Sequence, residues 1–295
     1  MSTLAIARVA PSDLLALTKP RIVLLVLVTA AVGFLLAPAS MSAAARAVLL
    51  AHLLVGTALV AGGTNALNQI LERDVDALMQ RTANRPLPAG RLPVSAASAF
   101  ALGTGTLGIA YLARLVDAAT ATLAAVTLVS YVAVYTPMKR RSPLATLVGA
   151  VPGALPIVGG WTAGGGALGG RAALLFGILF LWQLPHFLAL GWIHRADYAR
   201  AGLATLSDGD PDGRRTFRQA TLDAAALLVV SLLPALVGLA GPVYFLGAGA
   251  LSTWLLARAI RCARAPSREE ARRLFHATLL WLPAVLVLLV LDRAP

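Results

Sequence analysis

The chain has 295 residues, of which 58% are hydrophobic and 13% charged, and its formal net charge is +12. Soluble globular domains carry about 25% charged residues, so this composition argues against a soluble domain and indicates a membrane protein. The single cysteine, Cys262, excludes an intramolecular disulfide and argues against a thiolate metal cage.

Nine apolar stretches are long enough to cross a hydrocarbon layer about 30 Å thick, which takes roughly 20 helical residues. In chain order they cover residues 20–38, 47–70, 94–112, 118–137, 144–162, 172–192, 220–240, 242–260 and 274–291. The sequence therefore predicts an all-α, polytopic membrane protein, a bundle of nine transmembrane helices around an apolar cavity open to the cytoplasmic side. Residues 1–18 lack the features of a cleaved signal peptide, and we expect them to form a cytoplasmic N-terminal segment. We expect residues 19–295 to form a single membrane domain.

The basic residues are sorted to one side of this bundle. With the N-terminus in the cytoplasm, 21 of the 25 Lys and Arg residues fall on the cytoplasmic side. The exceptions are Arg46, Arg114, Arg171 and Arg293. This split satisfies the positive-inside rule, so the charge reflects membrane topology and argues against nucleic-acid binding.

The first long inner loop, residues 68–91, combines acids and arginines. On a helix that turns about 100° per residue, Asn68, Glu72 and Asp76 share one face at roughly 6 Å intervals, whereas Asp74 points away. One amide and two carboxylate oxygens suit Mg²⁺, and arginines bind phosphate oxygens. The arginines of this segment are Arg73, Arg81, Arg85 and Arg91. A site for magnesium-bound diphosphate and a solvated, self-neutralising loop both fit this spacing.

A second cationic segment follows the fourth span. Lys139, Arg140 and Arg141 are consecutive and lie between Pro137 and Pro143. Three cations at a helix end form a patch large enough to bind one phosphate group. The same three cations also satisfy the positive-inside rule. The segment is either a second phosphate contact or a topological signal.

The sixth span contains His186, and an ionisable residue inside a membrane is a functional candidate. If the helix continued to Asp197, the two residues would share a face to within about 20°, roughly 16 Å apart along the axis. Asp197 would then help to hold a second metal ion, with the deeper His186 facing the second substrate. A histidine that packs beside the kink at Pro185 is the alternative.

Together these segments resemble the UbiA-type intramembrane prenyltransferases and, within them, the haem farnesyltransferases. The family's first acidic motif, an Asn followed by acids at +4 and +8, matches Asn68, Glu72 and Asp76, and the haem-specific form continues to Arg91. The other matching segments are residues 135–140, 149–161, 182–187 and 197–202, and the resemblance covers residues 18–292. The sequence departs from the pattern in Glu72, where Asp is usual, and at residues 203–207. Of the family's second acidic pair, only Asp197 is clear, so this sequence supplies one acidic ligand for a second metal.

The resemblance implies that residues 19–295 form one prenyltransferase domain in a bacterial inner membrane. The implied reaction joins the farnesyl group of farnesyl diphosphate to a vinyl group of haem b, with water, and gives haem O and diphosphate. The implied cofactor is Mg²⁺, and haem b is a substrate rather than a prosthetic group. The implied partners are the two substrates, the lipid bilayer, and a haem A synthase or terminal-oxidase assembly proteins.

The resemblance also implies roles for individual residues. The catalytic residues are Asn68, Glu72, Asp76 and Lys139. The metal ligands are Asn68, Glu72 and Asp76, with Asp197 at a second metal. The diphosphate contacts are Arg73, Arg81, Arg85, Lys139 and Arg140. The haem-side candidates are His186, Trp182 and Phe187.

Two alternative functions stay open. A relative that prenylates a benzoate, naphthoate or chlorophyllide is disfavoured by the Arg73-Asp74 pair and by residues 185–187. A transporter without enzymatic activity predicts charges in mid-span, whereas here the acids gather at one inner face.

Overall fold

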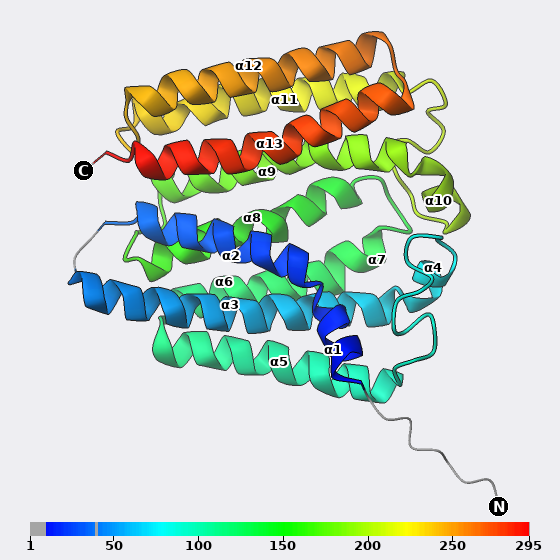
Figure 1. The fold of residues 1–295 in the computed structure, drawn as a ribbon, viewed down its shortest axis with the longest axis horizontal. Helices are drawn as coiled ribbons and strands as arrows, with labels where there is room; N and C mark the ends of the chain where they lie inside the picture. The colour runs from blue at the N-terminus through cyan, green and yellow to red at the C-terminus, as the bar shows by residue number, and fades with distance from the viewer. Residues whose placement is uncertain (1–9, 39–40, 295) are drawn as a thin grey trace, which may run out of the picture.

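The computed structural model describes residues 10–38 and 41–294, which are predominantly helical (Figure 1). Within them the only β contact is an isolated antiparallel bridge between Ala240 and Arg293, so the all-α prediction is confirmed. The first part of the expected cytoplasmic segment, residues 1–9, lies outside the described residues. In chain order the helices are α1 (Pro11–Thr18), α2 (Pro20–Leu36), α3 (Ala43–Leu71), α4 (Arg73–Ala77), α5 (Val94–Leu115), α6 (Ala118–Val129), the π-helix η1 (Ser130–Tyr135), α7 (Thr136–Met138), α8 (Ala145–Ala163), α9 (Gly170–Ile193), α10 (Arg195–Arg200), α11 (Arg214–Leu236), α12 (Pro242–Arg264) and α13 (Arg268–Leu291).

The long helices lie side by side, and the short helices α4, α7 and α10 gather at one end of the bundle (Figure 1). In the described residues, 8 helices are long and apolar enough to span a membrane, counting α6, η1 and α7 as one. The 17-residue helix α2 reaches this length only together with α1, from which it is bent by 48°. A multi-pass membrane protein is therefore confirmed, whereas nine spans stay a prediction.

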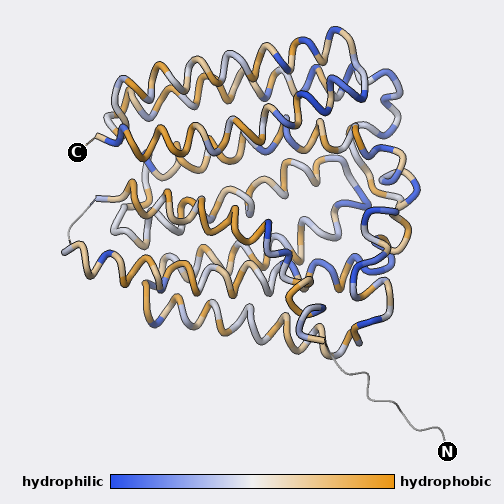
Figure 2. The backbone as a smooth tube through the Cα atoms, in the orientation of Figure 1, coloured by the Kyte–Doolittle hydropathy of each residue, from blue (hydrophilic) through white to orange (hydrophobic). Residues whose placement is uncertain are grey.

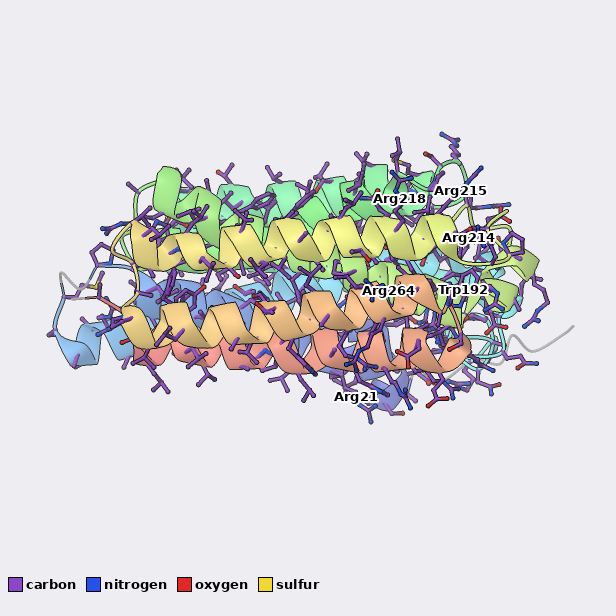
Figure 3. The ribbon with its side chains drawn as sticks, turned by 90° about the horizontal axis from the view of Figure 1, so that it is seen from above. Arg21, Trp192, Arg214, Arg215, Arg218 and Arg264 are labelled. Atoms are coloured by element: carbon purple, nitrogen blue, oxygen red, sulfur yellow. The ribbon has the colours of Figure 1, made fainter. Side chains whose placement is uncertain are left out.

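Hydrophilic residues concentrate at the end of the bundle that holds the short helices (Figure 2). Arg214, Arg215, Arg218 and Arg264 all lie at this end (Figure 3). The apolar helix surfaces and this basic end agree with the charge distribution expected from the sequence. That this end faces the cytoplasm stays a prediction.

Helices α2 and α8 approach each other closely through glycines. A Cβ added to Gly33 would lie 2.0 Å from the Ile157 carbonyl oxygen, and one added to Gly160 would lie 1.8 Å from that of Ala30. Small residues let helix backbones touch, which is a common packing mode in membranes. This contact fixes the relative position of two helices that line the central cavity.

The largest cluster of buried apolar side chains joins α8, α9 and the last three helices. Trp281, Tyr244 and Phe217 are fully buried in it. Because such large rings are fully buried, α11, α12 and α13 form a tightly packed unit. Helices α8 and α9, which line the cavity, are joined to this unit by the same cluster.

Candidate active site

A cavity of about 520 Å³ lies inside the bundle, with walls from α2, α3, α6, α8 and α9. Most of its lining is apolar, as the prediction of an apolar cavity required. Its charged lining residues are Lys19, Glu72, Asp76, Arg81, Arg85 and Lys139. The apolar volume therefore meets a compact group of charges of both signs.

The acidic face of the site comes from the end of α3. The helix is interrupted at Glu72, yet Glu72 N–H still donates to the Asn68 carbonyl at 3.0 Å and Asp76 N–H to the Glu72 carbonyl at 2.7 Å. This spacing of four residues keeps Asn68, Glu72 and Asp76 on the cavity wall. The Asp74 side chain is 85% exposed and pairs with Arg73. The prediction that Asp74 lies off this face is confirmed.

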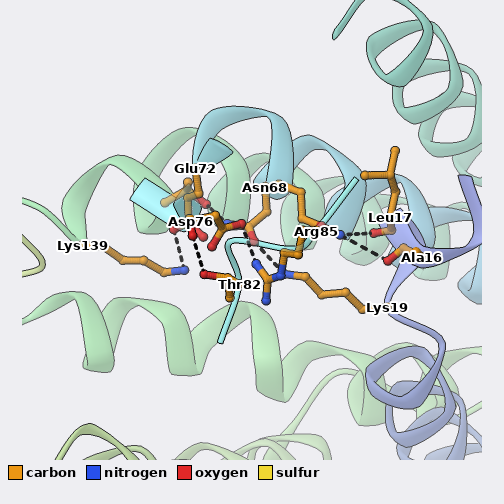
Figure 4. Close-up of polar contacts among 11 residues, drawn as sticks. Ala16, Leu17, Lys19, Asn68, Glu72, Asp76, Thr82, Arg85 and Lys139 are labelled. Atoms are coloured by element: carbon orange, nitrogen blue, oxygen red, sulfur yellow. Dashed lines mark hydrogen bonds and ion pairs between the residues drawn. The ribbon is translucent and has the colours of Figure 1, made fainter. Parts of the chain in front are cut away.

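Each of the three oxygen-bearing side chains contacts a different cation of the chain (Figure 4). Lys19 Nζ donates to Asn68 Oδ1 at 2.9 Å. Arg85 Nη1 donates to Asp76 Oδ2 at 2.6 Å, and Lys139 Nζ lies 2.7 Å from Glu72 Oε1. The site thus holds groups that can bind a divalent cation and groups that can bind an anion, in contact with one another.

Lys19 is the main residue of the site that the sequence motifs do not indicate, because in the sequence it contributes only to the positive-inside charge. It lies at the bend between α1 and α2 with a φ of 53°, and Pro20 starts the next helix. Gln69 Nε2 donates to the Leu17 carbonyl at 2.7 Å and Asn65 Nδ2 to the Thr18 carbonyl at 2.9 Å. These bonds hold the bend against α3, so the Lys19 side chain reaches the cavity. A Lys-Pro pair at the start of the first span is the signal that could have revealed it.

Lys139 is positioned by the π-helix η1. Its ammonium lies 4.4 Å from the centre of the Tyr135 ring, and the Tyr131 and Tyr135 ring centres are 4.9 Å apart. Gly149 of α8 leaves the space that Tyr135 occupies, since an added Cβ would lie 2.4 Å from this ring. π-Helical turns often occur at functional sites because they re-aim side chains, and here both tyrosines line the cavity.

The loop after α4 carries Arg81 and Arg85 back to the cavity. Thr82 Oγ1 donates to the Asp76 carbonyl at 2.8 Å, and Arg85 N–H donates to the Thr82 carbonyl at 3.0 Å, so Thr82 ties the loop back to the end of α4. Buried Met79 and Leu87 anchor the same loop. Arg81 lines the cavity and has no carboxylate partner among the described residues. It is therefore free to bind an anion.

Three predicted site residues lie outside this cavity. Arg73 pairs with Asp74 on the surface, and Arg140 lines a smaller hollow that shares Glu72 with the main one. Asp197 forms an ion pair with Arg200. Contacts of these residues with diphosphate or a second metal stay predictions.

The uninterrupted helix expected from His186 to Asp197 is wrong. Helix α9 ends at Ile193, and α10 starts at Arg195. At this break the Arg195 guanidinium donates to the Trp192 carbonyl at 3.1 Å and lies 4.2 Å from the centre of the Trp192 ring. It thereby satisfies a carbonyl at the helix end. Beyond this break, burial raises the pKa of the Tyr198 phenol, which lines the cavity.

The structure brings the three haem-side candidates together on α9. His186, Trp182 and Phe187 all line the cavity. The His186 ring centre lies 5.1 Å from that of Trp182 and 4.7 Å from that of Phe275 on α13. This aromatic wall suits a flat apolar substrate.

The donor set fits a magnesium ion that also binds substrate oxygens. Among the described residues no three His, Cys, Asp or Glu side chains gather as a self-sufficient metal site. Asn68, Glu72 and Asp76 nevertheless supply one amide and two carboxylates. Glu72 Oε1 is buried, and the group that approaches it is the Lys139 ammonium at 2.7 Å. Mg²⁺ that binds phosphates typically has only a few protein ligands, and its other coordination positions are taken by substrate oxygens or water.

The model of the UbiA prenyltransferase family matches residues 26–283. The chain belongs to this family. The family resemblance predicted from the motifs is thus confirmed.

Curated relatives match this chain over nearly its whole length. "Protoheme IX farnesyltransferase" of Anaeromyxobacter sp. (strain Fw109-5) is 46% identical, over 97% of this chain and 97% of that protein. The protein of the same name from Solibacter usitatus is 42% identical, over 95% of this chain and 98% of that protein.

Solved structures show the same fold at low sequence identity. A digeranylgeranylglyceryl phosphate synthase has a TM-score of 0.80 at 15% identity, over 95% of this chain and 97% of that chain. A UbiA homologue from Archaeoglobus fulgidus bound to GPP and Mg²⁺ has a TM-score of 0.65 at 17% identity, over 94% of this chain and 99% of that chain.

Proposed function

We propose that the chain is a protohaem IX farnesyltransferase. It transfers the farnesyl group of farnesyl diphosphate to a vinyl side chain of haem b, with water, and gives haem O and diphosphate. The name shared by relatives that are 42–46% identical over almost the full chain supports the acceptor and the prenyl donor. The observation in the molecule that carries the proposal is the cluster in which Asn68, Glu72 and Asp76 each contact a cation beside an apolar cavity.

The composition of the cluster supports a role in binding diphosphate and in its release from carbon. Asn68, Glu72 and Asp76 would hold Mg²⁺, which supplies Lewis-acid stabilisation of the departing diphosphate. Lys19, Arg85 and Lys139 can turn from these oxygens to phosphate oxygens, and Arg81 adds a further positive charge. Preorganised positive charge of this kind stabilises the negative charge that develops as the allylic C–O bond breaks.

The cavity itself would serve the second stage of the reaction, in which the allylic cation joins the vinyl group. Its apolar walls shield the allylic cation from water until it meets the vinyl group. The aromatic rings of Tyr131 and Tyr135 line the same space and offer electron-rich faces to a cation. Water must enter only after the new carbon–carbon bond has formed.

The proposal includes location and partners. We place the charged end of the bundle, and with it the N-terminus, on the cytoplasmic side of a bacterial inner membrane, because the basic residues gather there (Figure 3). Haem O would then pass to a haem A synthase or to terminal-oxidase assembly proteins. Transport without catalysis is disfavoured, because the charges gather at one end of the cavity.

The test is an assay of the purified chain in lipid nanodiscs with Mg²⁺, farnesyl diphosphate and haem b. Mass spectrometry should detect haem O, and equimolar diphosphate should be released. Parallel reactions contain 4-hydroxybenzoate, a naphthoate or chlorophyllide in place of haem b. Turnover of one of these acceptors without haem O formation would contradict the proposal and support the alternative acceptor.

A further inference from the structure

The hydrogen bonds around His186 fix which ring nitrogen carries its proton. His186 Nδ1 lies 2.8 Å from Thr278 Oγ1 on α13. Thr278 Oγ1 also lies 2.6 Å from the Phe275 carbonyl oxygen. Two oxygens at this separation need a proton between them, and only the threonine hydroxyl can supply it. The hydroxyl therefore donates to Phe275, and it accepts from His186 Nδ1–H.

This arrangement leaves Nε2 of His186 as an open lone pair. A neutral imidazole protonated on Nδ1 has an unprotonated Nε2. Among the described residues, none forms a hydrogen bond with Nε2. This nitrogen also remains accessible and is not sealed inside the protein. Because Nδ1 is aimed at α13, Nε2 points away from α13, and His186 lines the cavity.

The ring is also held rigidly in this orientation. Trp182 stacks on it with an interplanar angle of 25°, and Phe275 lies against it with an angle of 30°. Trp182 Nε1 donates to the Thr278 carbonyl at 2.7 Å, so one residue of α13 braces both aromatic rings. Thr278 is fully buried, which excludes water as a competing partner. The ring can present only its free edge to a ligand.

We propose that His186 Nε2 is an axial ligand of the iron of the haem substrate, and that Thr278 is the positioning residue that fixes this tautomer. The inference rests on the proposed function, because it takes haem b as the acceptor. Histidines that bind metals usually donate the other ring N–H to a fixed acceptor, as His186 does here. An imidazole lone pair in an apolar, aromatic-lined cavity matches the iron of a metalloporphyrin. Coordination would fix the macrocycle, and thereby its vinyl groups, relative to the diphosphate site.

The experiment is optical titration of the full chain in nanodiscs with haem b, without farnesyl diphosphate. The wild type should show the Soret band and electron paramagnetic resonance signal of imidazole-ligated iron. His186→Ala should lose these signals, and added imidazole should restore them. Thr278→Val removes the acceptor of Nδ1–H at nearly constant volume and should weaken haem binding about tenfold or more. Thr278→Ser should restore it.

Two controls separate ligation from misfolding. His52→Ala removes a histidine that bonds to Tyr111 away from the cavity lining, and should leave the spectrum unchanged. Each variant should bind farnesyl diphosphate as the wild type does, and Thr278→Val should raise KM for haem without a matching rise for farnesyl diphosphate. An imidazole-ligated spectrum that persists in His186→Ala would overturn the inference. If the wild type forms haem O in that case, the proposed function survives without the inference. A wild type that shows the His186-dependent spectrum but forms no haem O would overturn the proposed function alone.

Discussion

The two long loops at the charged end have similar compositions but opposite uses of charge. In residues 72–93, Glu72 pairs with Lys139, which follows α7 far along the chain, and Asp76 pairs with Arg85 across the same loop at the cavity. In residues 194–213, the carboxylates pair with their neighbours, as Asp197 does with Arg200. The first loop aims charges into a cavity, and the second uses them to hold its own backbone.

This difference indicates that the role of a mixed-charge loop depends on where the ion-pair partners of its carboxylates lie, beside them on the surface or across a cavity. Local pairs on a surface contribute at most about 1 kcal/mol and organise little beyond themselves. Buried pairs between distant elements cost desolvation energy, so they persist where a substrate uses them or where further bonds satisfy both partners. This criterion supports the proposal that the loop after α3 carries the catalytic residues.

The largest effect is expected from Asp76→Asn. The change keeps the shape of a side chain that is 2% exposed but removes the charge that Arg85 contacts and that magnesium would need. We expect kcat to fall on the order of 10²–10³-fold or more, because a preorganised charge is lost at the departing group. Haem O formation by the purified variant measures this.

Asp74→Asn is the matched control for Asp76, since it lies two residues away and is exposed. Its activity should stay within about twofold of the wild type, as expected for a surface pair. An equal loss in the two variants would refute the assignment of one helix face to the metal.

Lys139→Met should raise the KM for farnesyl diphosphate about 10- to 100-fold, because a charge-assisted phosphate contact is lost. It should also destabilise the fold by roughly 3–5 kcal/mol, since Glu72 keeps a buried charge without its cation. The double variant Glu72→Gln with Lys139→Met should regain stability but not activity. Recovery of both would show that the pair is structural, and that the two loops differ less than proposed.

Asp197→Asn tests the second loop. Its ion pair with Arg200 is a local surface contact, so kcat/KM should fall less than about fivefold. The dependence of the rate on Mg²⁺ concentration should be unchanged. A loss as large as that of Asp76→Asn, with a shifted Mg²⁺ dependence, would establish Asp197 as a ligand of a second metal and break the contrast between the loops.

The smallest catalytic effect is expected from Asp210→Asn. Asp210 accepts bonds from the backbone N–H groups of Arg215 and Thr216 and from the Thr216 hydroxyl, and so caps α11. Partial burial disfavours its charge, but these bonds hold the pKa of Asp210 below its usual value. The variant should lose about 1–2 kcal/mol of stability in thermal unfolding and keep its kcat.

The pH dependence of Asp210 follows from the direction of that shift. A carboxylate with a lowered folded pKa stabilises the fold above its unfolded pKa of about 3.9, and this stabilisation is lost as the pH falls through the folded pKa. The stability difference between wild type and Asp210→Asn should therefore be constant at neutral pH and shrink below about pH 4. A difference that is independent of pH would contradict a charged cap.

The fold class and the acidic face could be predicted from the sequence because both depend on local periodicity. Span length follows from hydropathy, and the alignment of Asn68, Glu72 and Asp76 follows from the helical repeat. The partners of these residues could not be predicted in this way. Lys19 and Lys139 reach the site only through the packing of α1 and η1 against α3, and no periodicity encodes that contact.

The same limit applies around His186. Its intramembrane position was visible in the sequence, but Thr278 lies 92 residues later on another helix. The break at His194 has no glycine or proline to mark it in the sequence, and the bond from Arg195 to the Trp192 carbonyl is seen only in the structure. Long-range side-chain bonds set the site, whereas the sequence interpretation was limited to single helices.

The contact between Glu72 and Lys139 has a consequence for the biogenesis of the protein. At a synthesis rate of about 5–20 residues per second, the end of α3 exists for several seconds before the lysine is made. During that time an uncompensated carboxylate stands at the membrane boundary, where an unpaired charge is costly. We therefore expect the acidic face to close only when the segment of α6, η1 and α7 docks, and insertion intermediates that lack this segment should be open to quality-control proteases.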